Sequence, residues 1–158
     1  MHTDYCYREQ APTGDSMSDT SSDTERRERT KPESFRARTL TASFTVNDLA
    51  KSLAWYTDVL GFTVDQKHER GGQVRAVSLK AGDVRILLGQ DDGAKGMNRA
   101  KGAGSSIMLG TAQNVDEIAA RIKERGGVLA AEPTDMPWGA RVFRIEDPDG
   151  FKIAISSV

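Results

Sequence analysis

Side chains that carry nucleophilic or acid–base chemistry are scarce in this sequence. The 158 residues include two histidines, His2 and His68, and one cysteine, Cys6. No histidine partner is predicted for Cys6, so the sequence gives no support for a nucleophile of the Cys–His type. His68 stands alone near a predicted turn, which is typical of a surface histidine. The shortage of these residues is the first constraint on function.

Two groupings that resemble functional motifs have structural explanations. Asp147 and Asp149 belong to Asp147-Pro148-Asp149-Gly150, in which proline favours a type I turn and glycine closes it. A catalytic carboxylate pair there would need a third group, and none is evident. Gly102 and Gly104 lack the strand–loop–helix context of a phosphate-binding loop, which favours a linker.

The turn at 147–150 joins two predicted strands. Before it, Phe143 and Ile145 alternate with Val142, Arg144 and Glu146, the period of a strand with two different faces. After it, the residues at 151, 153 and 155 alternate in the same way with those at 152 and 154. One face of this hairpin is predicted to pack in a core, which leaves Arg144 on the other.

Composition excludes several classes of function. A net charge of −1 gives no electrostatic basis for binding nucleic acid or an anionic membrane. No apolar run approaches the roughly 20 residues that a membrane span needs, and the N-terminus has no apolar segment of the secretory type. The single cysteine suits a reducing compartment. We therefore expect a cytoplasmic protein with no nucleic-acid or membrane partner.

The chain divides into a polar tail and one folded domain. Residues 1–36 are rich in serine and charge with almost nothing apolar, so they cannot offset the entropy of ordering and are predicted to be disordered. Residues 37–158 are predicted to fold. Strands are predicted at 40–46, 62–66, 74–80, 84–88, 105–110, 128–131 and in the final hairpin, and helices at about 49–60 and 115–125.

The order of these elements repeats. Leu60-Gly61-Phe62 corresponds to Gly126-Gly127-Val128, and residues 75–79 correspond to 141–145. Repetition at this length predicts two similar βαβββ modules around a shared surface. Module one covers about 38–89, a glycine-rich connector about 90–104, and module two about 105–157.

The folded region resembles the vicinal oxygen chelate superfamily, which includes glyoxalase I, bleomycin-resistance proteins and extradiol dioxygenases. The matching pieces are Val46-Asn47-Asp48-Leu49 through Tyr56, Leu60-Gly61-Phe62, and Pro137-Trp138-Gly139 through Gly150. The resemblance covers roughly residues 38–157. It implies an α+β fold in which two tandem βαβββ modules with curved mixed sheets enclose a cleft.

The resemblance also locates where metal-dependent relatives carry their ligands. These are His, Gln or Glu on the opening strand of each module and Glu on the closing strand, because a divalent ion needs several ligands that converge from different strands. The corresponding residues here are Thr41 and Leu87 in the first module, and Ser106 or Ile107 together with Ala154 in the second. None is a good metal ligand, so no metal or other cofactor is expected.

Strand parity then gives the residues that would face the cleft. Two arginines stand among small hydroxyl and apolar groups, which would suit a flat or partly anionic molecule. The alternative is that these arginines pair with Glu or Asp across the interface. Trp138, in the loop before the hairpin, is predicted either to cover the cleft or to plug a gap between modules or subunits. The predicted ligand-binding residues are Arg144, Arg85, Trp138, Thr41, Ser43, Leu87, Val142 and Ala154.

These observations favour a metal-independent small-molecule-binding protein of the bleomycin-resistance type, without assigned catalytic residues. The alternative is a metal-dependent enzyme of the same superfamily, a glyoxalase-like lyase, an isomerase or a dioxygenase, with displaced ligands. The resemblance further implies a homodimer, with each cleft completed either within one chain or by the partner. A regulatory module that recruits a partner through its tail is a third class.

Overall fold

The structure is a computed structural model that describes residues 37–97 and 99–158. The predicted tail, residues 1–36, lies outside the described residues. Thr39–Val158 forms one compact unit. Within the described ranges, no helix is long and apolar enough to cross a membrane.

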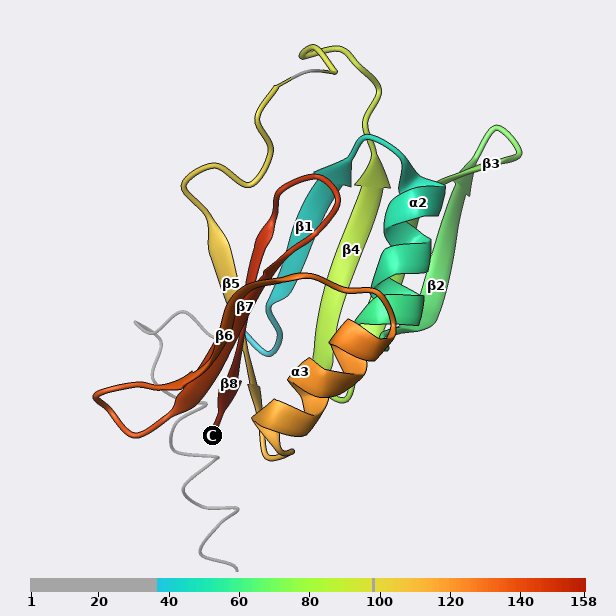
Figure 1. Cartoon of the computed structure of the whole chain (residues 1–158). Coiled ribbons are helices and arrows are strands. Elements are labelled where there is room, and N and C mark those ends of the chain that lie inside the picture. The colour runs from blue at the N-terminus through green and yellow to red at the C-terminus, as the bar shows by residue number, and fades with distance from the viewer. Residues whose placement is uncertain (1–36, 98) are drawn as a thin grey trace, which may run out of the picture. The chain divides into compact units, whose positions relative to one another are not determined.

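Two modules with the same order of elements make up this unit (Figure 1). The first contains β1 (Thr41–Val46), α2 (Leu49–Ala54), the π-helical segment η1 (Trp55–Val59), β2 (Thr63–Arg70), β3 (Gln73–Ala81) and β4 (Val84–Gln90). The second contains β5 (Ser106–Thr111), α3 (Val115–Glu124), β6 (Leu129–Asp135), β7 (Arg141–Glu146) and β8 (Lys152–Ser157).

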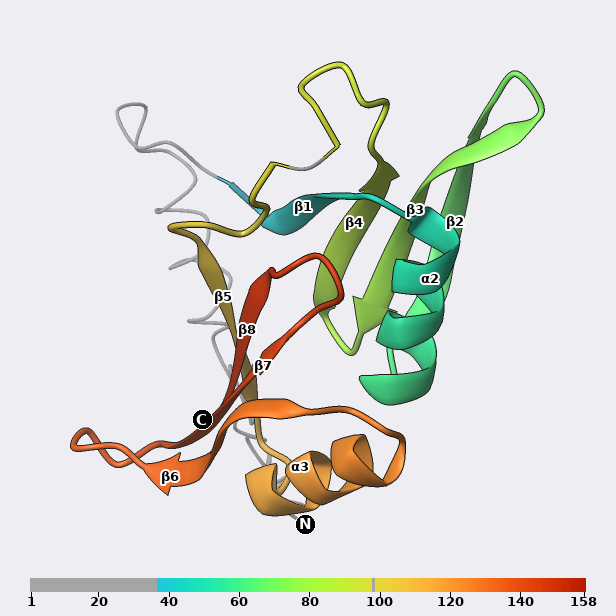
Figure 2. The same cartoon turned by 45° about the horizontal axis from the view of Figure 1, so that its top comes forward.

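Each module forms a four-stranded mixed sheet, with strand orders β1-β4-β3-β2 and β5-β8-β7-β6. In both sheets the opening strand pairs parallel to the closing strand, and the remaining pairs are antiparallel. The helical segment of each module lies against its own sheet (Figure 2). The predicted α+β fold of two tandem βαβββ modules is confirmed.

Capping residues fix the start of both helices. Asp48 accepts a hydrogen bond from the backbone N–H of Lys51 at 3.0 Å, and Asn114 accepts from Asp116 and Glu117 at 2.9 and 3.2 Å. These bonds satisfy donors that a helix N-terminus leaves free. The first helix then widens into η1 instead of ending as a regular α-helix, and closes with a 3.0 Å bond from the Phe62 N–H to the Tyr56 carbonyl.

Strand β2 is longer than the sequence predicted. It was expected over 62–66 but runs to Arg70, directly into a two-residue turn at Gly71 and Gly72. Both glycines have positive φ, 62° and 72°, the conformation that tight hairpins require and that glycine adopts without strain. Strand β6 also extends past the expected 128–131, because Pro133 is tolerated on an edge strand of a sheet.

A single apolar core joins the two modules. One cluster of buried residues contains side chains from both sheets and both helical segments. Phe44 of β1 stacks on Phe151, which precedes β8, with ring centroids 4.3 Å apart. This contact connects the opening strand of one module to the closing hairpin of the other.

The turn between β7 and β8 is bonded to the first helical segment. Asp147 Oδ2 accepts a hydrogen bond from the buried Tyr56 hydroxyl at 3.0 Å. Asp149 accepts from the backbone N–H of Asn47 at 2.9 Å and from the Ser52 hydroxyl at 3.1 Å. Burial, followed by the nearby Asp147 carboxylate, raises the pKa of Tyr56 far above its ordinary value, and burial also raises the pKa of Asp147.

The connector is held at the same end of the unit. Lys101 Nζ lies 2.6 Å from Asp91 Oδ2, and both side chains are almost wholly buried. Arg99 approaches the same oxygen at 2.9 Å, and the hydrogen bond from Lys101 holds the pKa of Asp91 below its usual value. Gly102 lies so close to Gly150 that a Cβ at position 102 would be 2.3 Å from the Gly150 carbonyl oxygen.

We expect Asp147→Ala to lower the free energy of unfolding by about 3 kcal/mol, because it leaves a buried hydroxyl without its acceptor. It also removes the acceptor of the backbone N–H groups of Asp149 and Phe151. Urea unfolding would measure the change. Asp92→Ala is the matched control, since the exposed Asp92 accepts one backbone bond, from Ala94. Equal losses in both variants would contradict the assigned role of Asp147.

Candidate functional site

Each sheet has one face covered by helix and one face free of it, here called the helix-free face. On β1, Phe44 and Val46 are buried in the core, whereas Thr41, Ser43 and Thr45 are exposed. Strand register extends this division across both sheets. The two helix-free faces are therefore the surfaces on which the predicted ligand-binding residues should lie.

Four predicted residues meet on the helix-free face of the first sheet. Thr41 is paired with Arg85, and Ser43 with Leu87, between the parallel strands β1 and β4. Arg85 Nε lies 3.3 Å from Asp65 Oδ2, and Lys80 approaches the other oxygen of Asp65 at 3.8 Å. Arg85 therefore pairs with an acid on β2 of its own sheet, whereas the alternative prediction was pairing across an interface.

The helix-free face of the second sheet carries the other arginine. Arg144 of β7 is paired with Ala154 of β8, and Val142 with Ser156. Val142 and Ala154 share the predicted face but are only 2% and 8% exposed. Arg144 is exposed and forms no ion pair within residues 37–97 and 99–158. Arg144 is thus an accessible cation of this face, which it shares with the exposed Lys152 and Glu146.

Trp138 lies at the tip of the hairpin loop between β6 and β7. The loop is closed by hydrogen bonds from Met136 N–H to the Ala140 carbonyl at 2.8 Å and from Gly139 N–H to the Met136 carbonyl at 2.9 Å. The Trp138 side chain is 67% exposed. It therefore does not plug a gap between the two modules of its own chain.

His68 lies near the turn at Gly71 and Gly72, as predicted, but inside β2 and not after it, because β2 runs to Arg70. It is paired with Ala76 on β3, and its Nε2 lies 3.1 Å from the Ser78 hydroxyl. Ser78 is in turn paired with Leu87, so both residues share the helix-free face. The sequence signal for the longer β2 was the turn at Gly71 and Gly72, since both strands of a tight hairpin extend to its turn.

The donors available at the family's metal positions do not fit a divalent ion. The register resolves the ambiguity in the second module: Ser106 pairs with Lys152 and shares the face of Ala154, while Ile107 pairs with Ile153 and packs towards the core. Two hydroxyls and two aliphatic side chains thus occupy the four positions. Within the described ranges, no group of three or more His, Cys, Asp or Glu side chains is arranged to hold a metal.

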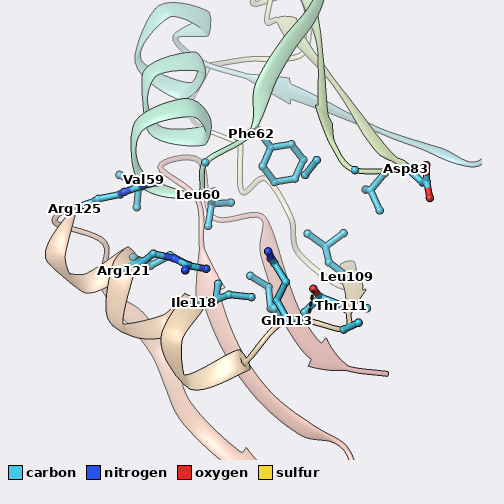
Figure 3. A pocket seen from close by; sticks show the side chains of 18 residues that line it. Val59, Leu60, Phe62, Asp83, Leu109, Thr111, Gln113, Ile118, Arg121 and Arg125 are labelled. Atoms are coloured by element: carbon cyan, nitrogen blue, oxygen red, sulfur yellow. Dashed lines mark hydrogen bonds between the residues drawn. The ribbon is translucent and has the colours of Figure 1, made fainter.

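One pocket lies elsewhere, between the modules on the side where the helices pack (Figure 3). It is formed by the end of η1, the β3–β4 turn, the end of β5 and α3. None of the eight predicted ligand-binding residues lines it.

Comparison with known proteins gives a consistent family. Residues 38–155 match the model of the Glyoxalase/Bleomycin resistance protein/Dioxygenase superfamily. A "Probable lactoylglutathione lyase" of Synechocystis sp. is 31% identical over 116 residues, covering 70% of this chain and 87% of that protein. A "Lactoylglutathione lyase" of Salmonella typhimurium is 26% identical over 124 residues, covering 75% and 90%.

Solved structures agree with these sequence matches. A superfamily member from Sphaerobacter thermophilus is 27% identical, with a TM-score of 0.65 over 78% of this chain and 98% of that chain. TioX from Micromonospora sp. has a TM-score of 0.63 at 19% identity, over 77% of this chain and 98% of that chain. At this lower identity the likeness is one of fold.

Proposed function

From the premise that this chain belongs to the Glyoxalase/Bleomycin resistance protein/Dioxygenase superfamily, we propose that it binds a small planar or anionic molecule without a metal ion. The ligand would be held on the helix-free faces of the sheets. Binding rather than chemistry is the activity, as in the bleomycin-resistance branch of the superfamily.

The observation that carries this proposal is the identity of the residues at the metal positions. Leu87 and Ala154 stand on the closing strands, where metal-dependent relatives present carboxylates. Their side chains have no lone pair to donate, and the hydroxyls of Thr41 and Ser106 are poor substitutes for imidazole or carboxylate. The scaffold is retained while the donor set that a Lewis-acid mechanism needs is replaced.

Arg144 is the residue we assign to anion recognition. A guanidinium can donate two parallel hydrogen bonds to a carboxylate, sulfonate or phosphate, and such charge-assisted pairs are among the strongest in proteins. Arg85, by contrast, is already engaged by Asp65 at 3.3 Å. Trp138 offers an exposed aromatic surface for a planar group.

A second copy of the chain would complete the site. The predicted residues on the strands fall into two groups, one on each sheet. Met108, which is paired with Ala154, is 61% exposed on the helix-free face of the second sheet. Met108 would be buried if the helix-free faces of two copies met. We propose a homodimer in which helix-free faces of two copies meet.

The names of the relatives favour a second candidate, a metal-dependent glyoxalase-like enzyme. Such an enzyme would need metal ligands at positions other than the four that the family uses. Among the described residues, 37–97 and 99–158, His68 is the one imidazole on a helix-free face, and it is engaged with Ser78. A single histidine does not supply the several donors that a divalent ion requires.

Metal retention separates the two candidates. We expect purified protein that is incubated with Zn²⁺ or Ni²⁺ and then desalted to keep no stoichiometric metal, because the four positions lack donors. Inductively coupled plasma mass spectrometry would measure this, alongside a thermal-shift screen of metals, thiol adducts and planar antibiotics. One tightly held metal per chain together with lactoylglutathione lyase activity would overturn the binding proposal.

We expect Arg144→Gln to weaken binding of a planar aromatic anion such as 8-anilinonaphthalene-1-sulfonate about tenfold, the effect of losing one charge-assisted hydrogen bond of about 1.4 kcal/mol. Fluorescence titration would measure the affinity. Arg75→Gln is the matched control, an exposed arginine on β3 outside the predicted site. Unchanged affinity in Arg144→Gln would remove the assignment of this residue.

We expect Met108→Asp to shift the chain from dimer to monomer, because it places an unpaired charge in the proposed contact. Sedimentation velocity across a concentration series would report the shift. Val128→Asp is the control, since Val128 is 82% exposed but lies between α3 and β6. A wild-type chain that stays monomeric at all concentrations would refute the dimer.

A further inference from the structure

The pocket between the modules has the size and lining of a ligand site. It encloses about 690 Å³, within the range of roughly 300–1,000 Å³ typical of small-molecule sites. It lies on the helix side of the sheets, bounded by the end of η1, the β3–β4 turn and α3. It is therefore separate from the helix-free faces.

One wall of this pocket is apolar. Leu60, Leu109 and Ile118 are half-buried, and their side chains lie around the opening in Figure 3. Phe62 is buried behind them, at 5% exposure. These side chains come from both modules, so the wall exists only where the modules meet. It offers a surface for an apolar body of a ligand.

Cationic and amide donors stand beside this wall. Arg121 lies in α3, and Arg125 is the residue that caps the C-terminus of this helix. In Figure 3 the guanidinium of Arg121 and the amide of Gln113 both point towards the pocket. Arg125 lies across Gly61, where a Cβ would be 3.3 Å from its Nη1.

Arg121 and Arg125 differ from nearby cationic residues in their ion pairing. Lys123 on the same helix is paired with Glu132 at 2.7 Å, and Arg141 is paired with Asp116 and Asp135. Neither Arg121 nor Arg125 forms an ion pair with any other residue in the part of the chain that the structure describes. Asp83, the acidic side chain of the lining, stands at the opposite edge of the pocket in Figure 3.

We propose that this pocket is a second ligand site, selective for a small organic monoanion with an apolar body, such as a medium-chain carboxylate. The carboxylate accepts hydrogen bonds from Arg121 and Gln113, and the chain lies against Leu60, Leu109 and Ile118. Arg125 adds positive charge at the same edge. The site does not depend on the function proposed for the helix-free faces.

Titration of the full-length protein with butyrate, hexanoate and octanoate tests this proposal. Affinity should rise about fourfold for each methylene that enters the apolar wall, at about 0.8 kcal/mol per methylene. In ¹⁵N–¹H spectra, the amides that shift should be those of residues 59–62, 81–84 and 109–113. Octanol, which lacks the charge, should bind about tenfold more weakly than octanoate.

Two substitutions locate the anion. Arg121→Gln should weaken octanoate binding about tenfold, whereas Arg75→Gln, the matched control on β3, should leave it unchanged. Since Arg121 is exposed, its replacement should not impair folding, and the spectra verify this directly. Equal affinities of octanoate and octanol, or loss of binding in Arg144→Gln instead of Arg121→Gln, would overturn the proposal.

Discussion

The unit depends on the docking of one turn onto one helix. Asp147 and Asp149 of the β7–β8 turn accept hydrogen bonds from Tyr56, Ser52 and the backbone of Asn47. Because Tyr56 is buried beside the turn, the cost of desolvating its hydroxyl is offset only while the carboxylate of Asp147 is in place. This contact sets how the second hairpin meets the first helix, and so which faces of the two sheets stay free.

The two modules share an architecture but present different surfaces. The first sheet carries hydroxyls, an arginine held by Asp65, and the pair of His68 and Ser78. The second carries Arg144 beside aliphatic side chains that are largely buried. A ligand that contacted both would meet hydrogen-bonding groups on one side and the cations Arg144 and Lys152 on the other. This asymmetry favours an elongated molecule with one charged end.

The internal repeat and the family resemblance predicted the fold, and strand alternation predicted the face of Arg144, Arg85, Thr41 and Ser43, because period-two patterns report local geometry. It could not predict the docking of Asp147 and Asp149, which looked like turn residues, since their partners lie 91 to 102 residues away in the chain. Nor could it predict that Val142 and Ala154 are buried, which depends on tertiary packing. The choice between Ser106 and Ile107 needed the register with β8.

The buried ion pair between Lys101 and Asp91 affects how two copies of this chain can associate. Domain swapping, in which a hinge opens and one module changes chains, is a low-cost route to dimers. In this chain the hinge would be the connector between β4 and β5. The ion pair at Asp91, just after β4, holds this connector in place, and so does the close contact of Gly102 with Gly150. Opening it would break the ion pair of Lys101 with Asp91 and the close contact of Gly102 with Gly150. These two contacts therefore favour a dimer of intact chains over a dimer that exchanges modules.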